Sequence, residues 1–593
     1  MKKNKLIKIG KILIITILVL LFILYFYVAY PLWGLFFNAQ RHTNPPLTPA
    51  WALECWIWDN DFNTAARVDT LLVGYKKYDI PVRTINLDSP WCMRFNDYQI
   101  DTARYPNPKE WFAKRKSEGY RIVMWTTTMV NSLNKDTPVR NSEDWFNKAK
   151  SKGYLTGNGQ QNPWWKGKGG FIDYSNPEAM KWWRGMQQLV FDYGIDGWKL
   201  DDTATLSYYM AGPIPFLYRS TFSGLMSLRT YMDHFYRDEY HYGLTKNPEF
   251  ITLGRSIDQN FHPEGFAPLD AAPVTWVGDQ KHIWKTKETL VDDGNKKKDL
   301  IVTGIGGFEM AIQNILAAAK LRYNVIGSDV AGFSGSVIPS RLYIRWAQFS
   351  AFCGLFLNGG HGERALWRRT PKELEVIRKF SWLHTELVPY MYSYVVTGHE
   401  GGRVLQKPVD GKYHYLFGDD FLVAPLYQDT LNLKVTLPKG KWRYFFNDRE
   451  VFEGGTSFEK SFPLEEFPVF IREGAIVPLN IQRSYTGLGT KNNTGKDTWL
   501  IYPGMDNAFT LYHPDKSGTT TVSMRNLPDQ LEISVKDAKK PSVYTIRMDK
   551  RPSKVLFGEV ELSDSTDYHF DNQKHRLTVE IGQIRDGVIK LIN

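Results

Sequence analysis

Apolar and polar positions along residues 51–395 recur in an order that predicts a parallel α/β domain. Short apolar runs at residues 82–87, 120–125 and 195–200 can form strands, and each follows a segment with helical spacing. Helix-to-strand units in succession are typical of parallel sheets, because parallel strands need a crossover connection. Further strand candidates cover residues 53–58, 250–254, 274–277, 324–328 and 353–357. Together they approach the eight strands of a (β/α)8 TIM barrel.

Local signals mark where several of the helices begin. Thr64 is expected to cap a helix over Ala65–Lys77. Asn107 stands before Pro108 and Asn176 stands before Pro177, and an Asn N-cap followed by Pro at the first helical position is a favoured start.

A polar or aromatic side chain closes each predicted strand. In TIM barrels the chemistry lies at the carboxyl ends of the strands, so these positions are candidate site residues. They are Asp59, Asp88, Trp125, Asp201, Arg255, Asp279, Asp329 and His361. Side chains alternate between the faces of a strand, so Lys199 and Asp201 share one face. Each position taken singly fits a polar turn. Because these positions all follow a strand in the helix-to-strand repeat, together they predict an active site.

The N-terminal region predicts a membrane anchor. No residue from 12 to 40 is charged, and residues 12–30 alone are long enough to span about 30 Å of hydrocarbon. The lysines before this segment favour a cytoplasmic N-terminus. We expect a cytoplasmic tail (1–11), a transmembrane signal anchor (12–33) and a spacer (34–50). The remainder is then extracytoplasmic, at a cell surface, in a periplasm or in a secretory lumen. A cleavable signal ending near Ala39 is the alternative.

The pattern of apolar and polar residues changes after the barrel, which we place at residues 51–397. Short alternating strands separated by Gly, Pro and Asp turns predict a proximal β-sandwich over residues 398–484 and a distal β-domain over 485–593. The predicted fold class is therefore α/β, a (β/α)8 TIM barrel followed by two C-terminal β-sandwich domains.

Composition narrows the function classes. The net charge is +11, but lysines among the first 11 residues supply five of these charges, so we do not predict nucleic-acid binding. Three cysteines are too few for a disulfide framework, and their spacing fits no zinc site. With 20 Trp and 32 Tyr, the chain has flat apolar faces suited to sugar rings. The sequence does not specify the oligomeric state.

Residues 171–202, FIDYSNPEAMKWWRGMQQLVFDYGIDGWKLDD, resemble glycoside hydrolase family 31. In that family a comparable helix leads to a strand that ends in the nucleophilic Asp. The resemblance gives this place to Asp201. The later segments KGKWRYFF and PVFIREGAIVP resemble the sandwich that follows the family's barrel.

Five further segments extend the resemblance. LGRSIDQN with VTWVGDQ implies that Asp279 is the acid/base and that Arg255 and Trp276 belong to the sugar subsite. NVIGSDVAGFSG places Asp329 in the pocket. RLYIRWAQFSAFCGLFLNGGH assigns His361 to sugar hydroxyls, and INLDSPW assigns Asp88 to the far side of the ring.

The family implies a retaining, exo-acting α-glycosidase that hydrolyses terminal α-linked sugars of oligosaccharides or glycans. Asp201 would attack the anomeric carbon while Asp279 protonates the leaving oxygen. We expect Trp58, Asp59, Trp125 and Lys199 to contribute to substrate binding, with Lys199 balancing the charge of Asp201. No metal or organic cofactor is implied, because the carboxylates map to sugar-site positions.

Three departures from the family pattern bear on specificity. Asp201 is followed by Asp202, Thr203 and Ala204 where family members carry Gly-Glu or Asn-Glu. The spacer stands where an N-terminal β-sandwich is expected, and residues 280–300 form a polar insertion after Asp279. Two alternatives stay open: an α-galactosidase rather than an α-glucosidase or α-xylosidase, and a membrane-tethered glycan-binding pseudoenzyme.

Overall fold

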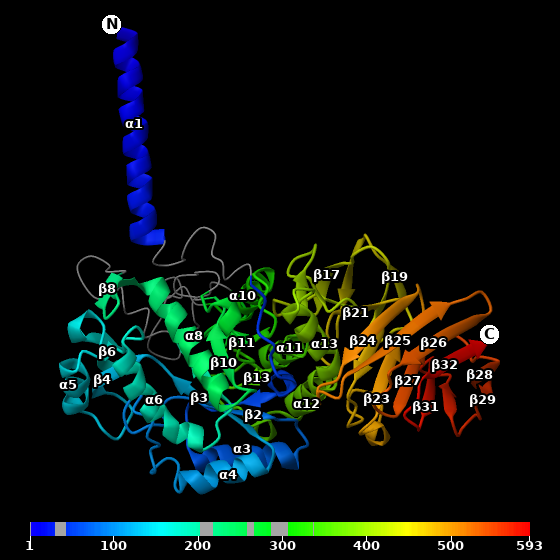
Figure 1. The fold of residues 1–593 in the computed structure, drawn as a ribbon. Coiled ribbons are helices and arrows are strands. Elements are labelled where there is room, and N and C mark those ends of the chain that lie inside the picture. The colour runs from blue at the N-terminus through cyan, green and yellow to red at the C-terminus, as the bar shows by residue number, and fades with distance from the viewer. Residues whose placement is uncertain are drawn as a thin grey trace.

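The structure is a computed structural model that describes residues 2–29, 43–201, 218–257, 266–285, 306–335 and 337–592. Figure 1 shows an N-terminal helix that projects from the body, a central α/β region and a β-rich C-terminal region. Asp202 to Ala204 and most of the 280–300 insertion lie outside the described residues.

The central region is built around an eight-stranded parallel sheet in the order β12-β11-β10-β7-β3-β2-β1-β13. A parallel bridge between Asp329 and Leu357 joins its two edges, so the sheet closes into the predicted barrel. The strands are β1 (Trp56–Ile57), β2 (Thr84–Leu87), β3 (Arg121–Thr126), β7 (Gly197–Leu200), β10 (Ile251–Arg255), β11 (Val274–Trp276), β12 (Ile326–Gly327) and β13 (Leu357–Asn358). Nearly every residue in them is buried, as expected where helices cover one face and side chains fill the other.

Helices surround the barrel strands (Figure 1). They are α3 (Ala65–Lys77), α4 (Pro108–Ser117), α6 (Pro177–Asp192), α8 (Leu228–Lys246), α10 (Phe308–Lys320), α11 (Ser340–Ser350), α12 (Pro371–Glu386) and α13 (Val388–His399). Two predicted caps are confirmed: the side chain of Thr64 accepts from the backbone N–H of Arg67, and that of Asn176 accepts from Glu178. Asn107 precedes α4 as predicted but makes no capping hydrogen bond, because its backbone is left-handed, with φ of 48°.

One predicted barrel strand was wrong in position. The apolar run Cys353–Leu357 was expected to be a strand, but residues 351–354 form a turn after α11, and β13 starts at Leu357. The turn is fully buried, with Gly354 against the backbone of Val325. An apolar run indicates that a segment is buried, but it does not distinguish a buried turn from a buried strand.

Two small sheets are inserted between barrel elements. The first follows β3, lies at the left of Figure 1 and consists of β4 (Met129–Asn134), β5 (Asn162–Trp164) and β6 (Gly167–Phe171). Helix α5 (Glu143–Ser151) connects β4 to β5. The second is the hairpin of β8 (Tyr218–Thr221) and β9 (Gly224–Ser227).

The C-terminal region contains four antiparallel or mixed sheets. The proximal sheets are β14-β15-β16-β21-β18-β19 and β17-β20, and the distal ones are β22-β23-β27-β31-β30 and β24-β25-β26-β32-β28-β29. Proximal strands are β14 (Gln406–Pro408), β15 (Tyr415–Phe417), β16 (Phe421–Val423), β17 (Asn432–Thr436), β18 (Lys441–Tyr444), β19 (Val451–Glu453), β20 (Ser457–Ser461) and β21 (Val469–Arg472). Distal strands are β22 (Ile476–Leu479), β23 (Asp497–Ile501), β24 (Asn507–Tyr512), β25 (Thr519–Asn526), β26 (Gln530–Lys536), β27 (Ser542–Arg547), β28 (Lys554–Phe557), β29 (Val560–Glu561), β30 (Tyr568–Asp571), β31 (Arg576–Ile581) and β32 (Gly587–Ile592).

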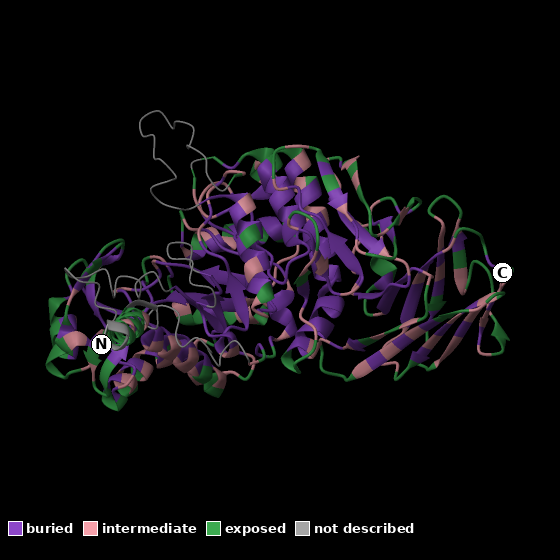
Figure 2. Cartoon of the chain, turned by 90° about the horizontal axis from the view of Figure 1, so that it is seen from above, coloured by how far each residue is buried: buried purple, intermediate pink, exposed green. Residues whose placement is uncertain are grey.

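The two β-regions differ in how they attach to the barrel. Core residues of the proximal sheets belong to the same buried cluster as the barrel, whereas the distal sheets enclose a cluster of their own. Figure 2 shows continuous burial through the barrel and an alternation of buried and exposed positions along the distal strands. That alternation is typical of antiparallel strands with one solvated face.

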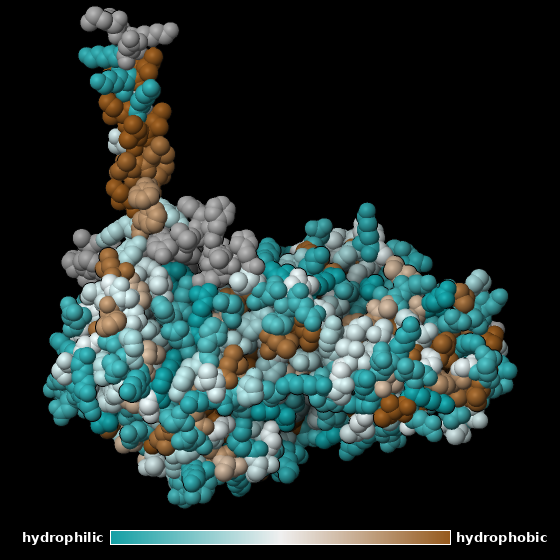
Figure 3. Space-filling model, in the orientation of Figure 1, coloured by the Kyte–Doolittle hydropathy of each residue, from teal (hydrophilic) through white to brown (hydrophobic). Residues whose placement is uncertain are grey.

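The N-terminal helix α1 (Lys2–Leu24) continues into one π-helical turn, η1 (Tyr25–Ala29). Lys5–Tyr27 is long and apolar enough to cross a membrane, judged by length and composition. In Figure 3 it forms a brown column beside a largely hydrophilic body. Residues 30–33 of the predicted anchor lie outside the described residues.

Candidate active site

A cavity of about 690 Å³ lies at the carboxyl ends of the barrel strands. Of the predicted residues, it is lined by Asp88, Lys199, Asp201, Asp279 and His361. These side chains come from strands far apart in sequence, so the barrel brings them together as the sequence predicted.

Asp201 stands at the first position after β7. Its backbone N–H donates to Thr126 O at 3.1 Å, which extends the pairing of β7 with β3 and fixes the direction of the side chain. One carboxylate oxygen, Oδ2, accepts from Trp125 Nε1 at 3.1 Å, and the other, Oδ1, accepts from Arg255 Nη2 at 3.2 Å. The carboxylate is therefore held from two neighbouring strands.

Asp279 lies three residues beyond the end of β11 and faces Asp201. Gly278 makes the turn with φ of 93°, a conformation that favours glycine. Asp279 Oδ2 accepts from Arg255 Nη2 at 3.0 Å, so one nitrogen of Arg255 binds both carboxylates. The side chain of Asp279 is 34% exposed and that of Asp201 is 11% exposed. Asp279 therefore lies on the solvent side of the pair.

Lys199 occupies the deep end of the cavity. Its Nζ donates to Asp88 Oδ2 at 2.6 Å and lies 4.3 Å from the ring centroid of Trp58 and 5.1 Å from that of Trp276. Asp88 also accepts from the backbone N–H of Ser89 at 2.8 Å. Burial lowers the pKa of Lys199, but the charges of three carboxylates outweigh burial and raise that pKa above its ordinary value.

Asp329 is buried behind Lys199. Its Oδ1 accepts from Trp58 Nε1 at 3.1 Å, while its Oδ2 has no hydrogen-bond partner among the described residues. Burial raises the pKa of Asp329 to about 7, against the opposing charge of Lys199. A buried oxygen without a partner is costly, which makes it a candidate ligand for a substrate hydroxyl.

Arg255 and Trp276 support the two carboxylates. The guanidinium of Arg255 lies 4.7 Å from the centroid of the fully buried Trp276 ring. The Lys199 ammonium lies 5.1 Å from the same centroid, so Trp276 contacts both Arg255 and Lys199 through its π system.

His361 and Asp59 differ in their surroundings. His361 lies at the cavity rim, where Nδ1 is 2.5 Å from Asp61 Oδ1 and the ring packs on Phe333. Asp59 does not line the cavity: its carboxylate accepts from Arg67 Nε at 2.8 Å and from the backbone N–H of Asp61 at 3.0 Å. These contacts stabilise the loop that carries Asp61.

Several lining residues were missed from the sequence. They are Asn60, Asp61, Asn63, Ser89, Pro90, Arg104, Asp136, Trp165, Lys166 and Phe333. Most lie in loops beyond the strand ends, which strand periodicity does not predict. A usable signal was the tandem Trp164-Trp165 in the segment after β3, because successive side chains of a strand point to opposite faces, so one of two neighbouring tryptophans is expected to point away from the core.

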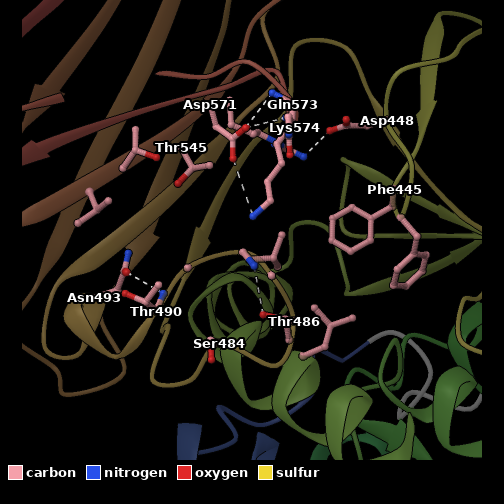
Figure 4. Close-up of a pocket in the computed structure, with 18 of the residues that line it drawn as sticks. Phe445, Asp448, Ser484, Thr486, Thr490, Asn493, Thr545, Asp571, Gln573 and Lys574 are labelled. Carbon is pink, nitrogen blue, oxygen red and sulfur yellow. Dashed lines mark hydrogen bonds and ion pairs between the residues drawn. The ribbon is translucent and has the colours of Figure 1, made fainter. Parts of the chain in front are cut away.

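A second cavity, of about 840 Å³, lies between α12, the proximal sheets and the distal sheets. Figure 4 shows Asp448 and Phe445 on one side, Asp571 and Lys574 on another, and Thr486 below. Its carboxylates are spread around the walls rather than paired. Within the described residues, no group of three His, Cys, Asp or Glu side chains could hold a metal ion, and the expectation of no cofactor stays a prediction.

Two family models match the chain. "Glycosyl hydrolases family 31 TIM-barrel domain" matches residues 45–294 and 299–394, and "Glycosyl hydrolase family 31 C-terminal domain" matches residues 404–477. These ranges contain all eleven residues that the sequence placed in the site.

Curated relatives are similar at low identity. An alpha-xylosidase from Emericella nidulans is 24% identical over 459 residues, covering 74% of this chain and 54% of that protein. Alpha-glucosidase 2 from Bacillus thermoamyloliquefaciens is 24% identical over 489 residues, covering 77% and 58%. The chain thus spans about half the length of the curated relatives it matches.

Among solved structures, the chain is similar to a Flavobacterium johnsoniae GH31 dextranase complexed with glucose. The TM-score is 0.77 at 19% identity, covering 93% of this chain and 71% of that chain. This likeness supports the fold of the barrel and the β-sheets that follow it.

Proposed function

Because this chain belongs to glycosyl hydrolase family 31, we propose that it is a retaining, exo-acting α-glycosidase that removes terminal α-linked sugars from oligosaccharides or glycans. In the proposed reaction Asp201 attacks the anomeric carbon while Asp279 protonates the glycosidic oxygen. The leaving group departs, and Asp279 then takes a proton from the water that releases the sugar from Asp201.

The arrangement around Arg255 carries this proposal. Arg255 Nη2 lies 3.2 Å from Asp201 Oδ1 and 3.0 Å from Asp279 Oδ2, so these two oxygens are at most about 6.2 Å apart, the sum of the two distances. Retaining enzymes separate their carboxyl groups by about 5–5.5 Å and inverting enzymes by about 6.5–9.5 Å. The bound applies to one oxygen of each carboxylate, and it agrees with the shorter separation of a retaining enzyme.

The burial of one end of the cavity supports exo action. Asp88, which lines the cavity and binds Lys199, is 6% exposed, and Asp329 and Trp58, which lie beside Lys199, are 1% and 2% exposed. A sugar ring whose anomeric carbon lies at Asp201 would fill this closed end, and the leaving group would point towards Asp279 and solvent. A chain could not continue past the buried end.

The relatives named above support glucose or xylose as the released sugar, because one is named an alpha-xylosidase and the other an alpha-glucosidase. No observation favours the α-galactosidase alternative. The apolar helix α1 supports a membrane-tethered enzyme whose catalytic barrel lies outside the cytoplasm, with Lys2 to Lys11 on the cytoplasmic side.

A panel of nitrophenyl α-glycosides tests the proposal on the full-length protein in mild detergent. We expect turnover of the α-glucoside or the α-xyloside above that of the α-galactoside, and NMR should show the α-anomer as the first product. Binding without turnover of any substrate would support the glycan-binding alternative, and a β-anomer as first product would contradict retention.

A further inference from the structure

The loops that follow β1 and β13 meet at the rim of the catalytic cavity. Because β1 pairs in parallel with β13, both strands end at the same face of the barrel and their following loops are neighbours. The backbone N–H of Asn60, in the first loop, donates to Gly360 O, in the last, at 3.3 Å. Asn60, Asp61 and His361 all line the cavity. The barrel therefore places Asp61 beside His361.

Both carboxylate oxygens of Asp61 contact the loop that carries His361. Oδ1 lies 2.5 Å from His361 Nδ1, and Oδ2 accepts from the backbone N–H of Gly362 at 3.0 Å. Asp61 is itself anchored by Asp59, whose Oδ1 accepts from the backbone N–H of Asp61 at 3.0 Å. The other oxygen of Asp59 accepts from Arg67 Nε at 2.8 Å. The position of the Asp61 carboxylate is therefore fixed by the protein itself.

The contact with Asp61 determines which nitrogen of the imidazole carries a proton. A carboxylate only accepts hydrogen bonds, so Nδ1 of His361 donates to Asp61. In the neutral ring Nε2 is then the acceptor. Nδ2 of Asn60 lies 3.2 Å from Nδ1 and 3.0 Å from Nε2. Since Nδ1 already donates to Asp61, Asn60 can donate only to Nε2, and both neighbours select the same tautomer.

The imidazole is also packed against an aromatic ring, but this packing does not select its orientation. The ring centroids of Phe333 and His361 are 4.9 Å apart, and Phe333 in turn stacks on Trp58 at 5.9 Å. A rotation of the imidazole by 180° about its Cβ–Cγ bond would preserve the contact with Phe333 while exchanging Nδ1 for Cδ2. The hydrogen bond to Asp61 distinguishes the two orientations, because only Nδ1–H can donate to it.

A sugar hydroxyl fits the groups that this arrangement presents. A hydroxyl both donates and accepts, so it can donate to His361 Nε2 while it accepts from Asn60 Nδ2. We infer that Asp61 is the positioning residue that holds His361 in the tautomer and orientation in which Nε2 accepts from a substrate hydroxyl. This inference rests on the proposed glycosidase function. It assigns to Asp61 a part in substrate affinity rather than in bond cleavage.

A double-mutant cycle tests the inference on full-length protein in mild detergent, with a nitrophenyl α-glycoside that the wild type hydrolyses. Asp61→Ala should raise KM about tenfold and change kcat by less than about threefold. His361→Ala should raise KM at least as much. Because Asp61 acts through His361, adding Asp61→Ala to His361→Ala should change KM by less than about twofold. Asp61→Asn keeps an acceptor for Nδ1–H, so its KM should lie between those of the wild type and Asp61→Ala.

Glu363→Ala is the matched control, because Glu363 supports the same loop without touching the imidazole. It accepts from the backbone N–H of Ala365 at 2.8 Å, and its Oε1 lies 3.5 Å from Arg67 Nη2. It is not among the described residues that line the cavity. Glu363→Ala should keep KM within about twofold of the wild type. The side chains of Asp61 and His361 are 35% and 37% exposed, so their truncation should leave the fold intact.

Three results would overturn the inference and leave the proposed function standing. The first is an equal rise in KM when Asp61→Ala is made in the wild type and in His361→Ala. The second is the same rise in KM for Glu363→Ala as for Asp61→Ala, and the third is a loss in Asp61→Ala that falls on kcat or does not occur. A wild-type protein that hydrolyses no α-glycoside would overturn the proposed function and this inference with it.

Discussion

Two cavities among the described residues differ in how their charged groups are arranged. The buried side chains of Lys199 and Asp201 line the barrel cavity of about 690 Å³. Asp329 is buried close enough to Lys199 for their charges to interact, and one of its oxygens has no hydrogen-bond partner among the described residues. The second cavity, of about 840 Å³, lies between α12, the proximal sheets and the distal sheets, and we call it the interdomain cavity. In it Arg576 binds Asp448, and Asp571 accepts from two backbone N–H groups. The larger cavity therefore holds its charged groups in separate contacts on different walls, and one nitrogen of Arg576, Nη1, is buried without a partner among the described residues.

Buried charged groups that converge on one point therefore indicate a catalytic site better than the volume of a cavity does. A substrate that enters the barrel can satisfy groups that the protein leaves incomplete. A molecule that enters the interdomain cavity would have to compete with the existing partners of the carboxylates of Asp448 and Asp571. Matched substitutions in the two cavities measure whether catalysis depends on the barrel cavity alone.

The largest effect is expected at Asp201. Asp201→Asn removes the nucleophile but keeps the shape of the side chain, and we expect kcat for an activated α-glycoside to fall by about 10⁴-fold or more. Asp571→Asn makes the same chemical change in the interdomain cavity and should keep kcat within about twofold. Steady-state kinetics measure both, and comparable losses in the two variants would contradict the comparison.

The next effect is expected at Asp279. Asp279→Ala removes the proton donor, so we expect a loss of about 10²–10⁴-fold for a sugar leaving group and a much smaller loss for fluoride, which departs without a proton. Added azide, a nucleophile that needs no general base, should accelerate turnover of the fluoride. A variant equally slow on both substrates and insensitive to azide would remove Asp279 from the acid/base role.

A third effect concerns pH. The pKa of Asp329 is raised to about 7, and its carboxylate must be ionised to accept two hydroxyl bonds from the sugar. We therefore expect kcat/KM to fall as the pH drops below about 7, because the free enzyme then carries protonated Asp329. Lys199→Met removes a charge that lowers this pKa, so the fall should move to higher pH by about one unit. A pH profile that is unchanged in Lys199→Met would contradict the assignment.

The smallest effect concerns stability beside the interdomain cavity. Burial raises the pKa of Glu386, at the end of α12, to about 8, although Thr486 donates to it at 2.7 Å. The folded state therefore binds this proton more tightly than the unfolded state, and the contribution of Glu386 to stability falls as the pH rises from about 4.5 to 8.

Glu386→Gln removes this titration and keeps an acceptor for Thr486. We compare the unfolding free energy of the variant with that of the wild type at pH 5 and at pH 9. The difference, variant minus wild type, should be on the order of 1–3 kcal/mol more positive at pH 9 than at pH 5. Denaturant unfolding at the two pH values measures the difference. A variant whose relative stability does not change with pH would show that Glu386 does not titrate in this range.

The barrel and the core of its site could be predicted from the sequence, because both follow from strand periodicity. Asp88, Asp201, Asp279 and Asp329 follow strand ends, and the closed barrel places strand ends at one face. The same periodicity misplaced the strand expected at residues 353–357, since burial of a turn also produces an apolar run.

Features set by tertiary packing could not be predicted. Asp59 follows a strand end as Asp88 does, yet Arg67 and nearby backbone N–H groups occupy its carboxylate. Trp165 enters the cavity from an inserted turn, whose direction depends on Asn131 and on the close approach at Gly167. No local sequence pattern specifies such approaches between distant segments.

Trapping the covalent intermediate would identify the nucleophile of the protein. Full-length protein is incubated with 5-fluoro-α-glucosyl or 5-fluoro-α-xylosyl fluoride, and intact-mass and peptide analysis locate the label. The account predicts one fluoroglycosyl group per chain, bound to the carboxylate of Asp201, and no label in Asp201→Asn. A label on another carboxylate, or hydrolysis of the reagent with inversion and without a labelled enzyme, would contradict it.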